Sequence, residues 1–219
     1  MSHLYPIFLD VSQRRVVIVG GGAVAARKAA GILAAGAKSV RAVAPKFVRE
    51  FPKEFQKKLA NFEPADLDGA ELVFAATDSA VVNDAVVAEA RKRGIWVQRG
   101  DEQEDEPGDF IIPAILRCGP ITVAVSASGS PALAAGLRDR LAGGVTDEWV
   151  KLAEAMKQLR PKIKSSGLPI SRRREIFRAL ATPDAAVALE SGGMHGLRKW
   201  LRGKFADLPE FQSEAGGVG

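Results

Sequence analysis

Cysteine and histidine are scarce in this chain of 219 residues, which has one Cys, Cys118, and two His, His3 and His195. A single cysteine cannot form a disulfide within the chain, so disulfides do not hold this fold together. One cysteine and two histidines also fall short of the four ligands of a structural zinc site. We expect Cys118 to be a small buried residue and His195 a surface or structural histidine. The sequence therefore predicts no metal site.

Long apolar runs are absent as well. No stretch approaches the roughly 18 apolar residues from which a membrane span is predicted. The opening MSHLYPIFLD carries the acidic Asp10 and lacks the basic and apolar regions of a signal peptide. These absences predict a cytoplasmic protein with no membrane partner.

Positive charge is concentrated in residues 151–204. The whole sequence has 31 Lys and Arg against 26 Asp and Glu, but residues 151–204 hold 13 basic and 4 acidic residues. This part could meet an anionic partner, or its charges could be the solvated faces of helices. Nucleic acid is not the expected partner, because only Phe177 and Trp200 are aromatic residues near the basic clusters.

Short β-branched runs alternate with longer Ala-rich stretches over the first 113 residues. The predicted strands are 16–19, 40–43, 72–76 and 95–98, and the predicted helices are 23–35, 47–59 and 81–93. This alternation is typical of βαβ units around a parallel sheet. We therefore expect a Rossmann-type α/β domain over residues 1–113.

The pattern changes after an acidic loop. Two β-rich runs, 110–116 and 121–125, predict a hairpin, and a helix is expected over 132–141. Further helices are predicted over 147–159, 171–180, 183–189 and 194–205. Because an isolated hairpin is marginal in water, we expect residues 114–146 to be a dimerisation segment. Residues 147–212 then form a helical domain, and 213–219 a disordered tail.

A glycine-rich motif follows the first predicted strand and opens the first predicted helix. Gly20-Gly21-Gly22-Ala23-Val24-Ala25 fits G-x-G-x-x-G/A in the context that a dinucleotide site requires. Gly20 permits a tight turn, Gly22 admits a pyrophosphate, and Ala25 permits close helix packing. The alternative is an ordinary glycine turn between strand and helix.

The acidic residue that would hold the adenosine ribose, about 20 residues further on, is missing. Ala44, Pro45 and Lys46 stand at the end of the second strand instead. Lys46 and Arg41 could suit a 2′-phosphate, so the spacing leaves NAD and NADP both open.

Polar residues follow two later strands, at the edge where open α/β sheets bind ligands. Thr77 and Asp78 end the strand over 72–76, and we expect Asp78 chiefly to cap the next helix. Asp101 follows the strand over 95–98, where a carboxylate could take a proton while hydride leaves in another direction. A solvated acidic loop is the alternative for Asp101 and its acidic neighbours.

These motifs, taken together, resemble the precorrin-2 dehydrogenase and sirohydrochlorin ferrochelatase family, the N-terminal module of siroheme synthase. The resemblance covers residues 1 to about 140, where the motifs follow one another in family order. They are Tyr5-Pro6-Ile7-Phe8-Leu9, Arg15 to Gly22 with Val24-Ala25 and Arg27-Lys28, Ala44-Pro45, Ala75 to Asp78 with Asn83, Phe110 to Ala114, and Ser130-Pro131 with Leu133-Ala134 and Leu137-Arg138.

The resemblance implies that a homodimer oxidises precorrin-2 to sirohydrochlorin with NAD as hydride acceptor. Gln98-Arg99-Gly100-Asp101 stands at the place of the family's Asn-x-x-Asp, which makes Asp101 the expected catalytic residue. The loop is longer than is usual in the family, so Asp105 is a rival. The expected cofactor-binding residues are Gly20, Gly21, Gly22, Ala23, Val24, Ala44, Pro45, Thr77 and Asp78, and the expected substrate-binding residues are Ser126, Ser128, Ser130 and Arg138.

The resemblance implies a role for the basic helices of residues 151–204. Their Arg and Lys side chains can bind the carboxylates of a tetrapyrrole through charge-assisted hydrogen bonds. Iron insertion is left open by the sequence, and no methyltransferase module is expected within these 219 residues. The alternative function is a non-catalytic redox sensor that binds a dinucleotide. Such a sensor would not need a carboxylate at the nicotinamide end.

Overall fold

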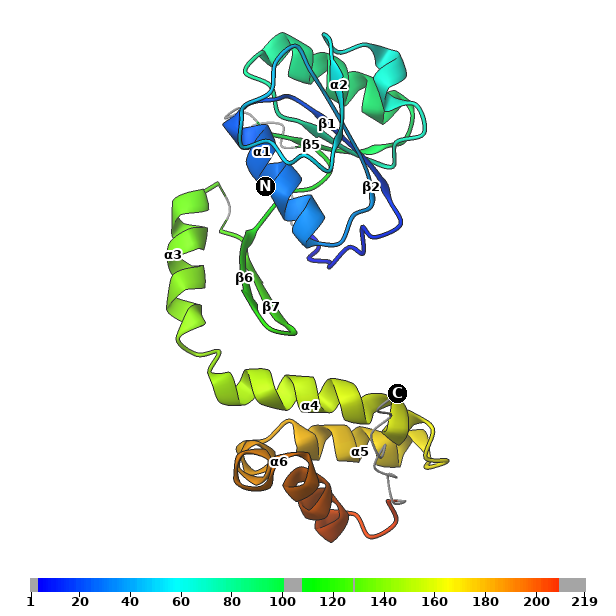
Figure 1. Ribbon diagram of the computed structural model, residues 1–219, viewed down its shortest axis with the longest axis vertical. Helices are drawn as coiled ribbons and strands as arrows, with labels where there is room; N and C mark the ends of the chain where they lie inside the picture. Colours follow the sequence, from blue (N-terminus) through cyan, green and yellow to red (C-terminus); the bar gives the residue numbers. More distant parts are fainter. Residues whose placement is uncertain (1–3, 101–107, 128, 209–219) are drawn as a thin grey trace, which may run out of the picture. The chain divides into compact units, whose positions relative to one another are not determined.

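The computed structural model describes residues 4–100, 108–127 and 129–208 and divides into two compact units (Figure 1). The first unit is Met1–Ile112 and the second is Pro113–Gly219.

The first unit is built on a five-stranded parallel sheet with the order β3-β2-β1-β4-β5. Its strands are β1 (Arg15–Val19), β2 (Ser39–Ala44), β3 (Gln56–Leu59), β4 (Leu72–Ala75) and β5 (Trp96–Arg99). Helices α1 (Ala23–Ala34) and α2 (Ala80–Lys92) and a 3₁₀ turn, η1 (Pro64–Leu67), connect them. The strand order reverses between β1 and β4, so the ligand crevice of such a sheet opens at the carboxyl ends of these two strands. The predicted Rossmann-type α/β fold is confirmed.

Successive side chains of β1 point to opposite faces of the sheet, and both faces are covered. Val16 and Ile18 pack with Ala25 of α1, whereas Val17 and Val19 belong to the core that contains Val86 of α2. A parallel strand buried on both faces reads as a continuous apolar run, which is how β1 was recognisable in the sequence.

The helix predicted over 47–59 is wrong. Turns followed by the edge strand β3 occupy this stretch. Phe47, Phe51 and Phe55 recur every four residues, which imitates a helical stripe, but they stack edge to face at 4.8 and 5.5 Å between ring centroids. Pro52 has no N–H for a helix interior and disfavours helical backbone at the residue before it. The phenylalanines therefore cover the sheet from irregular backbone.

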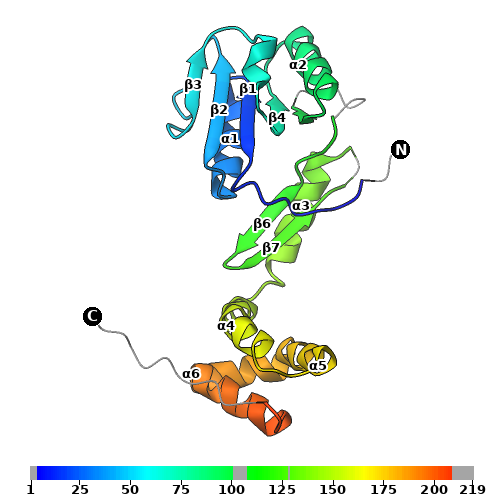
Figure 2. The ribbon, with the colours of Figure 1, turned by 90° about the vertical axis from the view of Figure 1, so that its right-hand side faces the viewer.

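The second unit begins with an antiparallel hairpin of β6 (Ala114–Cys118) and β7 (Ile121–Val125). Helix α3 (Pro131–Ala142) packs against both strands (Figure 2). Strand β6 begins at Ala114 and not at residue 110 as predicted, because Phe110 packs edge to face on Phe74 of the first unit's sheet. Cys118 is half-buried rather than buried.

Three helices complete the second unit, α4 (Asp147–Lys164), α5 (Ile170–Leu180) and α6 (Pro183–Lys204). Their shared core includes Leu152, Leu159, Ile163, Ile176, Leu180, Leu197 and Leu201. Helix α6 bends at Gly193, whose φ of 55° and ψ of −154° are not helical, between the two helices predicted for this stretch. Among the described residues, no helix has the length and apolar character to cross a membrane.

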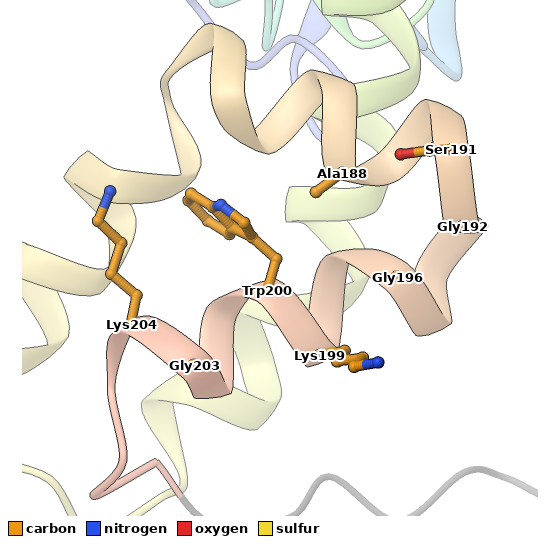
Figure 3. A pocket seen from close by; sticks show the side chains of 8 residues that line it. All are labelled: Ala188, Ser191, Gly192, Gly196, Lys199, Trp200, Gly203 and Lys204. Atoms are coloured by element: carbon orange, nitrogen blue, oxygen red, sulfur yellow. The ribbon is translucent and has the colours of Figure 1, made fainter.

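A groove lies between the two halves of α6 (Figure 3). It is lined by Ala188, Ser191, Gly192, Gly196, Lys199, Trp200, Gly203 and Lys204. The Lys204 ammonium lies 5.1 Å from the centre of the Trp200 ring. The two halves approach closely at Gly196, where an added Cβ would lie 2.7 Å from the Ala188 carbonyl oxygen.

Gly196→Ala is therefore expected to lower the free energy of unfolding by about 1–3 kcal/mol, the usual cost of overpacking. Gly203→Ala is the matched control, because an added Cβ there has no atom within 4 Å. Alanine at Gly203 should instead raise stability by up to about 1 kcal/mol through helix propensity. Urea denaturation of both variants measures the difference, and equal effects would contradict the close approach at Gly196.

Candidate functional site

The turn between β1 and α1 uses its three glycines differently. Gly20 has a φ of +132°, and an added Cβ would lie 2.2 Å from the Ala76 carbonyl oxygen. At Gly21 an added Cβ would lie 2.0 Å from the Lys46 carbonyl oxygen. At the exposed Gly22 it would meet no atom within 4 Å. Packing therefore requires glycine at the first two positions, whereas the third faces open space.

Hydrogen bonds from two neighbouring strand ends fix this turn. The Gly20 N–H donates to the Val43 carbonyl at 2.9 Å, and the Val48 N–H donates to the Gly21 carbonyl at 2.8 Å. The Ala76 N–H donates to the Val19 carbonyl at 2.8 Å. The turn is thus held in one conformation between the carboxyl ends of β2 and β4.

The N-terminus of α1 opens directly behind Gly22, its N-cap residue. Gly22 offers no side-chain acceptor, and the first turn of the helix contains no acidic residue. The first-turn N–H groups therefore have no side-chain cap, while the helix dipole adds positive potential there. Ala23 and Val24 are exposed, and Ala25 is fully buried against the sheet. Such a terminus can receive a phosphate group.

The end of β4 is fixed by a buried asparagine. The Asn83 Oδ1 accepts hydrogen bonds from the Thr77 N–H at 3.1 Å and the Thr77 hydroxyl at 2.8 Å, and Asn83 Nδ2 donates to the Thr77 carbonyl at 3.1 Å. The prediction that Asp78 caps α2 is wrong, because Ser79 is the N-cap and accepts from the Val82 N–H at 3.4 Å. Asp78 is exposed at the rim of this edge. A serine directly before an apolar helix was the signal for this cap.

The end of β2 distinguishes the two basic residues that could suit a 2′-phosphate. Arg41 lies within the strand, and its Nη2 donates to the Asp68 carbonyl at 2.6 Å. Lys46 is exposed beyond the strand end, next to the exposed Pro45. Ala44 is buried, and its Cβ lies 2.9 Å from where a Gly21 side chain would begin. Arg41 is therefore engaged away from the carboxyl edge.

The end of β5 brings Lys28 to the site, a residue of the Arg27-Lys28 motif to which the sequence assigned no role. Lys28 of α1 donates from Nζ to Oε1 of the buried Gln98 at 2.7 Å. Burial of its side chain, and then the charge of Arg27, lower the pKa of the Lys28 ammonium from 10.5 to about 8. The sequence signal for Lys28 was its place in the Arg27-Lys28 motif. Asp101 and Asp105 lie outside the described residues.

The residues expected to bind substrate lie in the second unit. Ser126 is exposed, and Ser130 caps α3 by accepting from the Leu133 N–H at 3.3 Å. Arg138 donates from Nε to Asp139 Oδ1 at 2.8 Å. Ser128 lies outside the described residues. The described parts of the chain contain no group of three or more His, Cys, Asp or Glu placed to hold a metal ion.

A parallel sheet with a strand–glycine turn–helix unit at its switch point defines the class of dinucleotide-binding α/β domains. A family profile described as "Putative NAD(P)-binding" matches residues 7–114. The siroheme synthase of Chromobacterium violaceum is 36% identical over 208 residues, which cover 92% of this chain and 44% of that protein. The siroheme synthase of Photorhabdus laumondii is 33% identical over 220 residues, which cover 98% of this chain and 46% of that protein. The chain therefore belongs to the siroheme synthase and precorrin-2 dehydrogenase family that its motifs predicted.

The chain spans less than half the length of these two relatives. A solved structure titled "SirC, precorrin-2 dehydrogenase" has a TM-score of 0.75 and 22% sequence identity. The match covers 91% of this chain and all of that one, and it supports the fold.

Proposed function

We propose that this protein oxidises precorrin-2 to sirohydrochlorin in siroheme biosynthesis, in the cytoplasm, with NAD as hydride acceptor. Two observations together support the proposal. The chain is 36% identical to a siroheme synthase over 92% of its length. The N-terminus of α1 has no side-chain cap, and the space beside Gly22 is free of protein atoms. The sequence relatives suggest the substrate, and the glycine turn supplies a place for the cofactor.

The chain's own groups fit a dinucleotide along the carboxyl edge of the sheet. The N–H groups at the start of α1 receive the pyrophosphate, and Gly22 leaves room for it. The adenosine half faces Ala44 and Pro45, and the other half faces Thr77 and Asp78, because the halves lie on opposite sides of the switch point. NAD supplies the hydride acceptor when it is bound. Arg41 donates to the Asp68 carbonyl, so of the two basic residues that could suit a 2′-phosphate Lys46 is the one exposed at this end, and the choice of NAD rests on the family.

Oxidation also requires a proton to leave the tetrapyrrole. We assign this proton to Asp101, which follows β5 in the chain at the nicotinamide side of the edge. The substrate's carboxylates are assigned to Ser126, Ser128, Ser130 and Arg138 and to the basic helices of the second unit. Arginine and lysine bind carboxylates through charge-assisted hydrogen bonds.

The direct test is to incubate the purified protein with precorrin-2 and NAD and to record the absorbance of sirohydrochlorin and NADH. Both products should accumulate in equal amounts. NAD binding without turnover would instead favour the non-catalytic redox sensor. A parallel incubation of sirohydrochlorin with Fe²⁺ tests iron insertion separately, through the spectrum of siroheme.

We also propose a homodimer formed through the segment of β6, β7 and α3. Leu133, Leu137 and Leu141 recur every four residues along α3 and are 56%, 39% and 49% exposed. Ile115 of β6 is exposed as well. An exposed apolar stripe of this kind is typical of an interaction surface.

Sedimentation at micromolar concentration should give twice the 23.3 kDa mass of one chain. Leu137→Glu should shift the protein toward the monomer, because it would bury a charge in the interface. Ala132→Glu, at an exposed position about 140° around the same helix from Leu137, is the control and should leave the dimer intact. A parent protein that sediments as a monomer would contradict the proposal.

A further inference from the structure

The side chain of Lys28 ends at the turn that follows β5. Its Nζ is hydrogen-bonded to Gln98, and its Cε lies 2.7 Å from the position that a Cβ on Gly100 would occupy. Glycine at position 100 therefore leaves the space that the end of the lysine fills. The ammonium is held at the carboxyl edge of the sheet rather than in bulk solvent.

This edge is continuous with the glycine turn. The Gly100 N–H donates to the Ala75 carbonyl at 2.8 Å, and Gly20 packs against the Ala76 carbonyl. From β1 to β5 the edge crosses two strand spacings, about 10 Å. In a Rossmann domain the adenosine ribose lies at the end of β2, so the nicotinamide half faces the ends of β4 and β5. The Lys28 ammonium thus lies on the nicotinamide side.

Among the described residues, no carboxylate pairs with Lys28. The ion pairs among residues 4–100, 108–127 and 129–208 do not include it. Arg27, its neighbour on α1, carries charge of the same sign. On β5, Gln98 is neutral and Arg99 is paired with Asp84 of α2. The Asp109 carboxylate accepts from the Val97 N–H at 2.9 Å. The Asp101 assigned above to the substrate's proton follows Gly100 in the chain. It is present in the parent protein and in every variant used below, so their comparison isolates the charge of Lys28.

We infer that Lys28 biases the bound dinucleotide toward its reduced form, by placing a positive charge beside the nicotinamide. This inference rests on the proposed function. The oxidised nicotinamide ring carries one positive charge, and the reduced ring is neutral. A nearby cation disfavours the oxidised form, and transfer of a hydride to the ring removes the repulsion. Lys28 is in this sense an electrostatic determinant of cofactor redox state.

Two unit charges about 10 Å apart at an effective dielectric constant near 20 change a binding constant on the order of tenfold. The Kd of NAD divided by the Kd of NADH should therefore be about tenfold larger than it would be without the charge. Because the pKa of Lys28 is about 8, this ratio should fall as the pH rises from 7 to 9 and the ammonium loses its proton.

The experiment measures the Kd of NAD and of NADH by calorimetry at pH 7 for the parent protein and three variants. Lys28→Met removes the charge, Lys28→Arg retains it, and Lys38→Met removes an exposed lysine before β2, at the opposite edge of the sheet. We expect the ratio of the two constants to fall about tenfold in Lys28→Met and to stay at the parent value in the other two.

Each other outcome overturns the inference. An unchanged ratio in Lys28→Met, or equal losses for both forms of the cofactor, would make Lys28 a structural residue while the proposed function stands. A parent protein that binds neither NAD nor NADH would reject the proposed function as well. Should Lys28→Met fail to fold, the Kd of NAD divided by the Kd of NADH is measured from pH 7 to pH 9 instead. This ratio should fall with pH in the parent protein and stay constant in Lys28→Arg. The same pH dependence in both proteins would contradict the inference.

Discussion

Replacement of Gly22 by Asp is expected to abolish NAD binding and to leave the fold intact. An added Cβ at Gly22 meets no protein atom within 4 Å, and the φ of −81° suits any residue. Aspartate is a good N-cap, so its carboxylate would bond to the N–H groups of α1 that otherwise receive the pyrophosphate. The substituted side chain would thus compete with the cofactor by both its volume and its charge. Calorimetry should show an affinity for NAD at least about 100-fold weaker, a loss of roughly 2.7 kcal/mol.

Two measurements make this prediction specific. The midpoint of thermal unfolding should stay at or above the parent value in Gly22→Asp, because the new cap stabilises α1. Gly20→Ala should lower it, because the added Cβ would clash with the Ala76 carbonyl. NAD affinity equal to the parent's in a folded Gly22→Asp protein would place the cofactor elsewhere.

Asp101→Ala is expected to reduce turnover of precorrin-2 at least about 100-fold with NAD affinity unchanged. The reason is that a positioned carboxylate takes the proton while the hydride leaves in another direction. Asp101 follows β5 more closely than Asp105 does, and groups next to a regular element are held more precisely than groups further along a loop. Asp105→Ala should therefore lose much less activity. Steady-state rates and calorimetry on the same preparations separate catalysis from binding.

The relative activities of the two variants identify the catalytic carboxylate. A fully active Asp101→Ala protein beside an inactive Asp105→Ala protein would move the catalytic role to Asp105. Full activity in both would mean that the base is a different group or that the proton passes directly to water.

The sheet was predictable because β1, β2, β4 and β5 are short runs rich in valine and other buried residues, bounded by glycine or a polar turn. The edge strand β3 was not, since its residues are exposed and the phenylalanines before it recur at helical spacing. The strand–turn–helix context of Gly20 to Gly22 was likewise visible in the sequence, because that motif is local.

What the sequence did not reveal depends on contacts between distant residues. The role of Lys28 depends on Gln98, which lies 70 positions away in the chain. The engagement of Arg41 depends on a backbone carbonyl 27 positions away. The error at Asp78 was of another kind: the N-cap is one residue further along, at Ser79, and Asp and Ser are both good N-caps.

The buried Asn83 has a consequence for how the cofactor would associate. Its amide already satisfies the N–H and the carbonyl of Thr77, and strand carbonyls already hold the glycine turn. Both turns that would contact the dinucleotide are therefore ordered before it arrives, and little backbone entropy is lost on association. This part of the protein should thus act as a rigid receptor, in which affinity reflects the contacts made and not the work of forming the site.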